Sequence, residues 1–232
     1  MVRFSPEQHQ QFARHGFLIV EHALARDAVE QIRTLLGALD PLQRDRANLR
    51  NVLAAAPGIR ELIRSNGVFE LAQQLLVRKP RLTRAILFDK KPGANWSVGW
   101  HQDITIAVLK RLDVPGFAGW SVKEGTTHVQ PPVDVLENML TVRLHLDACA
   151  DENGPLQILP ASHLHGRLSD DKLDRWTQRP AVTCATTAGS AILMRPLLLH
   201  RSSPAQAPSH RRVLHLEFAA AELPGGLEWN VA

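Results

Sequence analysis

The sequence predicts a mainly β protein in which an N-terminal layer of helices packs on an antiparallel barrel or two-sheet sandwich. Helix boundary signals and apolar residues at helical spacing dominate residues 1–78. Residues 79–220 instead hold short apolar or alternating runs, separated by turn-rich segments and with few helical stretches between them. We expect a single domain over residues 1–232, because a chain of this length can bury its own core without disulfides.

The helical layer begins with a boundary signal. Ser5 is a favourable N-cap and Pro6 a favourable first helical residue, so a helix is predicted over residues 6–15, ending at Gly16. Further elements predicted in this layer are a buried strand at 17–20, a helix within 25–39 that stops before Pro41, and two short helices within 58–76 that are separated at Asn66-Gly67.

Short runs with β character follow. Each is apolar or alternates between apolar and polar residues, which fits a strand with one face against a core. A helix interrupts them over residues 169–178, with Ser169 as its predicted N-cap. The predicted strands cover residues 81–91, 104–109, 139–149, 156–160, 190–195 and 212–219.

Charge and cysteine content narrow the classes of function. The formal net charge is +4, basic residues are scattered among carboxylates, and the chain holds no tyrosine. Nucleic-acid surfaces usually combine a concentrated basic face with aromatic side chains, so no nucleic-acid partner is expected. Cys149 and Cys184 lack metal-binding spacing, and no apolar run reaches the length of a membrane span. We therefore expect a soluble cytoplasmic protein with free thiols and no membrane partner.

Two His-x-Asp pairs are the first candidates for a metal site. Two imidazoles and one carboxylate on one face of an Fe(II) ion leave adjacent positions open for other ligands. Because residues i and i+2 of a strand point to the same side, a His-x-Asp pair supplies two of these ligands. His101 and Asp103 follow a loop-like run and open the predicted strand at 104–109, which places them at the mouth of the barrel.

The second pair lies at the end of a longer predicted strand. His145 and Asp147 close it, and Thr141 and Arg143 fall on the same face by the two-residue period. This arrangement fits either an ordinary polar face with cross-strand hydrogen bonds or a wall that faces the substrate. Position in the sequence alone does not decide which of the two pairs binds a metal.

A third histidine favours the first pair. His200 ends an apolar strand at the start of a turn-rich loop, and Arg211 opens the next strand. The two residues should be close if these strands form a hairpin. An inward arginine beside a metal can hold a dicarboxylate by a bidentate fork. Because Arg211 and Arg212 are adjacent in a strand and face opposite ways, one of them faces the barrel interior.

Together these segments resemble a known family. The runs "WHQD" (100–103) and "DENGPLQILPASHLHG" (151–166), followed by His200 and Arg211, resemble the phytanoyl-CoA dioxygenase family of Fe(II)/2-oxoglutarate-dependent oxygenases, over roughly residues 80–220. The resemblance implies a double-stranded β-helix with flanking helices, which agrees with the predicted organisation. It implies iron ligation by His101, Asp103 and His200, with 2-oxoglutarate and O2 as co-substrates. It assigns Arg211 to the distal carboxylate of 2-oxoglutarate, Ser202 to a hydroxyl that assists it, and Gln102, Trp120 and Lys90 to further co-substrate contacts.

The resemblance also bears on the reaction. It implies hydroxylation of an unactivated C–H bond, with release of succinate and CO2. Related halogenases replace the iron-ligating carboxylate with a small residue, so Asp103 favours hydroxylation, desaturation or ring chemistry over halogenation. Ala161 stands where the family's usual "PGSH" segment has glycine, which matters only if this position needs a positive φ. We expect His163 and His165 to form loop hydrogen bonds rather than to ligate metal.

The substrate is expected to be a small polar metabolite or a natural-product intermediate. Thr141, Arg143 and His128 are candidate contacts. An inward Arg143 would suit a carboxylate or phosphate, or would serve as a structural ion-pair partner. Residues 116–132 form a candidate lid with Gly119 and Gly125 as hinges. The alternatives are a non-enzymatic cupin-like protein that binds a metal or ligand, and a zinc hydrolase.

Overall fold

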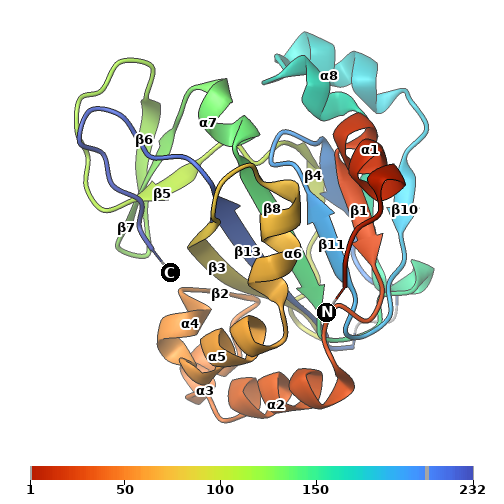
Figure 1. Ribbon diagram of the computed structural model, residues 1–232. Helices are drawn as coiled ribbons and strands as arrows, with labels where there is room; N and C mark the ends of the chain where they lie inside the picture. Colours follow the sequence, from red (N-terminus) through yellow and green to blue (C-terminus); the bar gives the residue numbers. More distant parts are fainter. Residues whose placement is uncertain (1, 207–208, 232) are drawn as a thin grey trace.

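A large antiparallel sheet forms one side of the molecule. The computed structural model describes residues 2–206 and 209–231 (Figure 1). The order of strands in this sheet is β1-β11-β8-β13-β3-β2, and every neighbouring pair is antiparallel. The strands are β1 (Phe17–Val20), β2 (Asn48–Arg50), β3 (Arg81–Lys90), β8 (Met139–His145), β11 (Ala191–Met194) and β13 (Arg211–Ala219).

Two smaller sheets complete the β structure. A four-stranded sheet has the order β10-β9-β12-β4, and a three-stranded sheet has the order β5-β7-β6. Their strands are β4 (Val98–His101), β9 (Leu156–Ile158), β10 (Val182–Cys184), β12 (His200–Ser202), β5 (Ile106–Val108), β6 (Ala118–Lys123) and β7 (Thr126–Gln130).

Helices cover the outer face of the large sheet. Figure 1 shows α2 to α5 gathered beside β2 and β3, with α6 in front of β8 and α1 beside β1. The predicted capping of α1 is confirmed: the Ser5 hydroxyl accepts from the Gln8 amide, and Gly16 ends the helix with a φ of 83°. The helices are α1 (Pro6–His15), α2 (Arg26–Gly37), α3 (Pro41–Arg44), α4 (Val52–Ala55), α5 (Gly58–Ser65), α6 (Val68–Leu75), α7 (Val133–Glu137) and α8 (Asp170–Thr177), with 3-10 turns at Asp151–Asn153 and Ser162–His165.

The two faces of the large sheet differ sharply in chemistry. On the outer face, apolar side chains such as Leu214 and Leu216 pack with those of the helices into the main core. On the inner face, the register aligns charged and polar side chains across β3, β13 and β8. These inward residues include Arg84, Lys90, Thr141, Arg143, His145, Arg211, His215 and Glu217, all but Arg84 buried. The part of the interior beside β3, β13 and β8 is therefore polar, whereas apolar side chains of β9, β10 and β11 pack together in another part.

The predicted fold class is confirmed, and the differences concern short elements. The helical layer also contains β2, which extends the large sheet. Sequence patterns did not indicate β4, β10 or β12, which contain four, three and three residues, too few for a clear alternation. They also missed β6 and β7, which lie within the predicted lid of residues 116–132. The helix after Ser169 is present, but the Ser169 hydroxyl donates to the Asp171 carboxylate at 2.6 Å and forms no cap bond. In the described part of the chain, no helix is long and apolar enough to cross a membrane.

Candidate iron site

His101 and His200 are brought together by strand pairing. They are direct partners in the antiparallel register of β4 and β12, so both side chains lie on the same face. Their ring centroids are 4.1 Å apart, with an interplanar angle of 53°. His200 is buried and His101 is partly open to solvent. His200 therefore opens β12; the prediction that it ends the preceding strand was wrong, because β11 stops at Met194.

Asp103 completes the group. One ligand atom from each of the three residues lies within 4.8 Å of the others. The Asp103 oxygens lie 3.9 Å from His101 Nε2 and 3.8 Å from His200 Nε2. The predicted position at the start of a strand was wrong: β4 ends at His101, and the Asp103 amide donates to the Pro196 carbonyl at 2.9 Å. A loop bond, rather than a strand ladder, sets the direction of this carboxylate.

Both imidazoles are held in the tautomer that suits a metal. His101 Nδ1 lies 2.8 Å from the Gly99 carbonyl, and His200 Nδ1 lies 2.8 Å from the Leu198 carbonyl. Because a carbonyl only accepts, each Nδ1 donates its hydrogen, which leaves each Nε2 as the atom that faces a metal. Burial lowers the pKa of His200 to about 3, which keeps this ring neutral at pH 7.

The charge state of Asp103 complements the two rings. Burial alone would raise its pKa, but His200, His215, His101 and Arg84 outweigh burial, so the pKa of this carboxyl is lowered. Its buried Oδ2 has no hydrogen-bond partner among the described residues. Two imidazoles and one carboxylate with an unsatisfied oxygen are the donor set that Fe(II) takes in non-haem oxygenases, so these residues fit an iron ion.

Gln102 fixes this motif to the surrounding loops. Its side-chain nitrogen donates to the carbonyls of Gly166 at 2.9 Å and Leu197 at 2.6 Å, and its oxygen accepts from the Leu168 amide at 2.8 Å. The amide is thus occupied by backbone groups. Its observed contacts fit a residue that positions the two neighbouring ligands better than one that contacts the co-substrate.

Lys90 and Arg211 form a cationic pair inside the barrel. They are cross-strand partners on β3 and β13 and are 0% and 4% exposed. Lys90 Nζ donates to Ser202 Oγ at 3.3 Å and to the Ser203 carbonyl, and Arg211 donates to the Gly154 carbonyl. Neither cation has a carboxylate within ion-pair distance in the described ranges. Lys90 is therefore not a solvated lysine, and the pair is ready to bind an anion.

The pKa of Lys90 reflects both its burial and the second cation beside it. Burial first, and Arg211 second, lower the pKa of Lys90 to about 8. Gly154 allows the adjacent loop to come close: its φ is +60°, and a Cβ there would lie 2.2 Å from the Ser203 carbonyl oxygen. The turn at Asn153-Gly154 thus holds the carbonyl that Arg211 contacts.

The predicted hairpin between the strands of His200 and Arg211 was wrong. β12 belongs to the four-stranded sheet and β13 to the six-stranded sheet. The bond between Lys90 and Ser202 connects the two sheets inside the barrel. The expectation that one of two adjacent arginines faces inward is confirmed for Arg211, since Arg212 points outward to Asp147.

The second His-x-Asp pair is divided between two environments. β8 ends at His145, so Asp147 does not share its face as predicted. Asp147 accepts from Arg212 Nη2 at 2.8 Å and from Arg33 Nη2 at 2.9 Å, a structural ion-pair cluster near the surface. His145 faces the interior, where burial lowers its pKa to about 3. This pair does not form a metal site in the described structure.

A buried polar network lies beside the iron site, and sequence reasoning missed most of it. Arg84 pairs with Glu217, whose Oε1 lies 3.1 Å from His215 Nε2. Arg143 Nη1 lies 3.0 Å from His215 Nδ1, and His215 Nε2 lies 3.9 Å from Asp103 Oδ2. The two-residue period of β13, counted from Arg211, would have found His215 and Glu217.

The remaining candidates lie on the inner wall and the small sheet. Thr141 is buried on β8, and His128 is buried on β7, where burial and Arg84 lower its pKa. Trp120 is half-buried on β6 beside an apolar cluster, with Arg111 5.7 Å from its ring centroid. Gly119 and Gly125 have positive φ values, as the strand turns around them require.

Ala161 has the backbone conformation that glycine favours. Its φ is 67°, so the condition under which this departure matters is met. The next residue, Ser162, accepts from the Leu199 amide and donates to the Leu159 carbonyl, each at 2.8 Å. The strained turn therefore supports the backbone immediately before His200. As expected, His163 bonds a backbone carbonyl, that of Ala13 at 3.2 Å.

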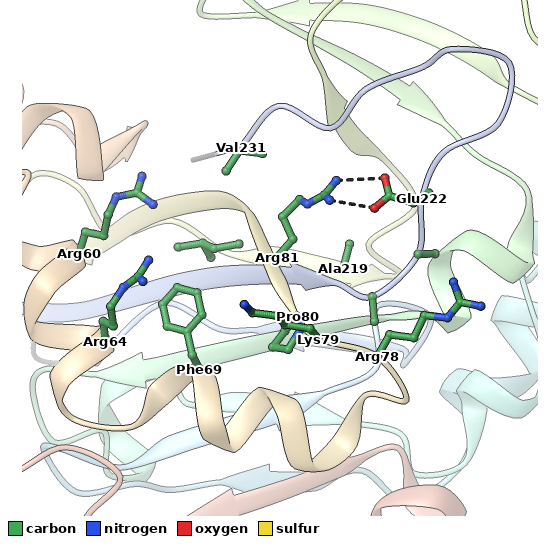
Figure 2. A pocket seen from close by; sticks show the side chains of 13 residues that line it. Arg60, Arg64, Phe69, Arg78, Lys79, Pro80, Arg81, Ala219, Glu222 and Val231 are labelled. Carbon is green, nitrogen blue, oxygen red and sulfur yellow. Dashed lines mark hydrogen bonds and ion pairs between the residues drawn. The ribbon is translucent and has the colours of Figure 1, made fainter.

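A cationic cleft of about 570 Å³ lies away from these ligands (Figure 2). It is bounded by Arg81 and Ala219, whereas Lys90 and Arg211 lie at the opposite ends of the same two strands. Figure 2 shows Arg81 paired with Glu222, while Arg60 and Arg64 lie on one side of Phe69. This cleft holds none of the three candidate iron ligands.

A family model described as Phytanoyl-CoA dioxygenase (PhyH) matches residues 12–213. The chain belongs to this family. PhyH proteins are Fe(II)- and 2-oxoglutarate-dependent oxygenases, so this protein is an enzyme of that class, with iron as its metal and 2-oxoglutarate as its co-substrate. A search of curated protein sequences found no match.

Solved structures share the fold of this PhyH protein at low identity. The carbocyclase SnoK from nogalamycin biosynthesis has a TM-score of 0.73 at 16% identity, covering 95% of this chain and 85% of that one. EctD from S. alaskensis, solved with 2-oxoglutarate and 5-hydroxyectoine, has 0.70 at 19%, covering 94% and 76%. AviO1 from Streptomyces viridochromogenes Tue57 has 0.70 at 21%, covering 97% and 99%. The predicted double-stranded β-helix is confirmed.

Proposed function

We propose that this PhyH protein hydroxylates an unactivated C–H bond of a small metabolite or natural-product intermediate, releasing succinate and CO2. The observation that carries the proposal is the joint presence of the His101, Asp103 and His200 group and the unpaired Lys90–Arg211 cations. In this proposal residues 1–232 form a single oxygenase domain. It acts in the cytoplasm, where the two buried cysteines stay free thiols.

Each of these residues receives a defined role. His101, Asp103 and His200 hold Fe(II), which with 2-oxoglutarate and O2 supplies the oxidising power for C–H cleavage. Arg211 and Lys90 bind the distal carboxylate of 2-oxoglutarate. Ser202 orients Lys90, and the Leu198 and Gly99 carbonyls hold the imidazole rings.

The charges of the site support a diacid co-substrate. Lys90 and Arg211 contact only neutral oxygens, and two buried cations without an anion are costly. One carboxylate of 2-oxoglutarate would neutralise them, and its other end would reach the metal. A bare metal-binding cupin or a zinc hydrolase has no use for such a pair, which argues against both alternatives.

The proposal also specifies the type of reaction at the substrate C–H bond, which is hydroxylation. The structural neighbours include a carbocyclase, an epimerase and an enzyme solved with a hydroxylated compound, so one fold accompanies several outcomes. Asp103 retains the ligating carboxylate, which supports hydroxylation over halogenation. Trp120 and residues 116–132 are proposed to cover the site, with Thr141, Arg143 and His128 facing the substrate.

An anaerobic titration tests the proposal. Fe(II) and then 2-oxoglutarate are added to the apoprotein while the weak visible charge-transfer band is followed. We expect the band with the wild type and its loss with His200→Ala; a wild type without the band, or an unchanged band in the variant, contradicts the assignment. Succinate release is then measured across a metabolite panel, and mass spectrometry of the product distinguishes a gain of one oxygen from desaturation.

A further inference from the structure

Three successive inward side chains of β8 are polar and buried. Thr141, Arg143 and His145 are 0%, 8% and 2% exposed, and they form one wall of the barrel interior. Each of them has at least one buried polar atom without a hydrogen-bond partner in the described part of the chain: Thr141 Oγ1, Arg143 Nε, and both ring nitrogens of His145. Buried polar groups in folded proteins are nearly always paired, so this wall is built to receive a ligand.

Arg143 is the charged member of the wall. Its Nη1 lies 3.0 Å from His215 Nδ1, and its guanidinium lies 5.9 Å from the Phe88 ring centroid. Within residues 2–206 and 209–231, no carboxylate lies at ion-pair distance from Arg143, so it is not the structural ion-pair partner that the sequence allowed. Burial lowers the pKa of Arg143 to about 10, so it remains a cation at neutral pH.

The other interior cations already have assigned anions. Arg84 is paired with Glu217. Lys90 and Arg211 take the distal carboxylate of 2-oxoglutarate in the proposed function. The Asp103 carboxylate and the second carboxylate of 2-oxoglutarate face the metal. Arg143 therefore remains as the buried positive charge for which neither the protein nor the proposed co-substrate position supplies an anion.

The position of Arg143 is next to the reacting centre. His215 contacts Arg143 through Nδ1, and its Nε2 lies 3.9 Å from Asp103 Oδ2. A single imidazole thus separates the guanidinium from an iron ligand. A group bound by Arg143 would hold the rest of its molecule within reach of the metal.

Cationic side chains also gather around Arg84, which faces the same interior. A narrow crevice is lined by Arg84 and His128 at its inner side and by Arg50 and Asn51 from the β2–α4 corner. Burial, then Arg50 and Arg84, lower the pKa of Lys123 on β6, so these three cations lie close together. Cations gathered near a site raise the local concentration of anionic ligands.

We propose that the substrate carries an acidic group, a carboxylate or phosphate, which binds Arg143 beside the iron site. This inference rests on the proposed function and specifies the substrate class for the same site. The metal-facing carboxylate of 2-oxoglutarate is a second source of the same chemistry, and the experiment separates the two sources.

The test uses the anaerobic Fe(II)·2-oxoglutarate enzyme and matched pairs of probes. Benzoate is compared with benzamide, hexanoate with hexanamide, and phenyl phosphate with phenol, and binding is read from changes in the charge-transfer band. We expect at least one acid to bind the wild type about tenfold or more tightly than its neutral partner. We expect Arg143→Met to lose this preference and Arg143→Lys to keep part of it, while the Kd for 2-oxoglutarate changes less than about threefold.

Each opposing outcome has a separate meaning. If no acid is preferred by the wild type, or if Arg143→Met keeps the preference, the inference is wrong. If Arg143→Met weakens 2-oxoglutarate binding as much as Arg211→Met does, Arg143 serves the co-substrate and the inference is also wrong. If the band never forms with the wild type, the proposed function itself has failed. Far-UV circular dichroism and thermal melts check folding, and Arg143→Gln replaces the Met variant if it does not fold.

Discussion

His101 and His200 are direct cross-strand partners, and each donates its Nδ1 hydrogen to the carbonyl of the residue two positions earlier in the chain. The same local hydrogen bond thus occurs twice, once at the end of β4 and once at the start of β12. The pairing of the strands turns this repetition into a site, since both Nε2 atoms face Asp103. The geometry of the ligands is fixed by backbone carbonyls that no side-chain substitution removes.

Removal of either histidine should abolish tight metal binding. His101→Ala and His200→Ala are expected to lower Fe(II) affinity by about 100-fold or more, because each variant removes one of three ligands. Anaerobic competition with a chromogenic chelator measures the Kd. His165→Ala is the matched control, because this histidine packs against Trp176 outside the site. An equal loss in the control would contradict the assignment.

Replacement of the two adjacent arginines should have different effects. Arg211→Met is expected to raise the Kd for 2-oxoglutarate by about 100-fold, since it removes a buried cation from the carboxylate site. Arg212→Met should leave that Kd unchanged and lower the free energy of unfolding by about 1 kcal/mol, because Arg212 binds Asp147 at the outer side. Titration of the charge-transfer band and chemical denaturation measure these quantities. Similar Kd values for both variants would contradict the inward assignment.

The affinity for 2-oxoglutarate should fall at alkaline pH. Lys90 in the free enzyme has a pKa of about 8, and a bound dianion favours its protonated form, so the pKa rises in the complex. Binding is therefore at full strength below about pH 8 and weakens above it, by up to tenfold per pH unit. Lys90→Met should bind weakly without this slope. A flat profile for the wild type between about pH 7 and 9.5 would show that Lys90 is not at the carboxylate.

Glycine at position 161 should stabilise the fold. Ala161 has a φ of 67°, a left-handed conformation that costs a residue with a Cβ about 1 kcal/mol. Ala161→Gly is expected to raise the melting temperature by roughly 2–4 °C. Ala13→Gly, in the exposed part of α1, is the matched control and should lower stability by about 0.5–1 kcal/mol. A destabilised Ala161→Gly variant would mean that the turn is held by other interactions.

The sequence allowed prediction of the ligands but not of how the strands assemble them. His101, Asp103, His200 and Arg211 were found from motif order and residue chemistry, and the helix ends from caps such as Ser5. The strands that carry the two histidines contain four and three residues, too few for periodicity to reveal them. Their register depends on long-range pairing, which local sequence does not encode.

The interior network shows a second limit. His215 and Glu217 lie in an apolar run, "RVLHLEFA", where polar residues at alternate positions fit either a solvent face or an interior face. Which face of β13 is interior depends on the helices, because they cover the face that carries the apolar side chains. The same uncertainty applied to Lys90: lysine is usually exposed to solvent, but this side chain is buried.

The iron ligands stand on or beside the four-stranded sheet, whereas Lys90 and Arg211 stand on the six-stranded sheet. In the proposed function, a co-substrate held by both must span the interval between them. The distance between the two sheets thus selects the length of the 2-oxo diacid that binds. Oxaloacetate, one methylene shorter, would leave one carboxylate away from its partner, and 2-oxoadipate, one methylene longer, would have to buckle. Selection of the co-substrate is then a property of the spacing between two sheets rather than of any single side chain.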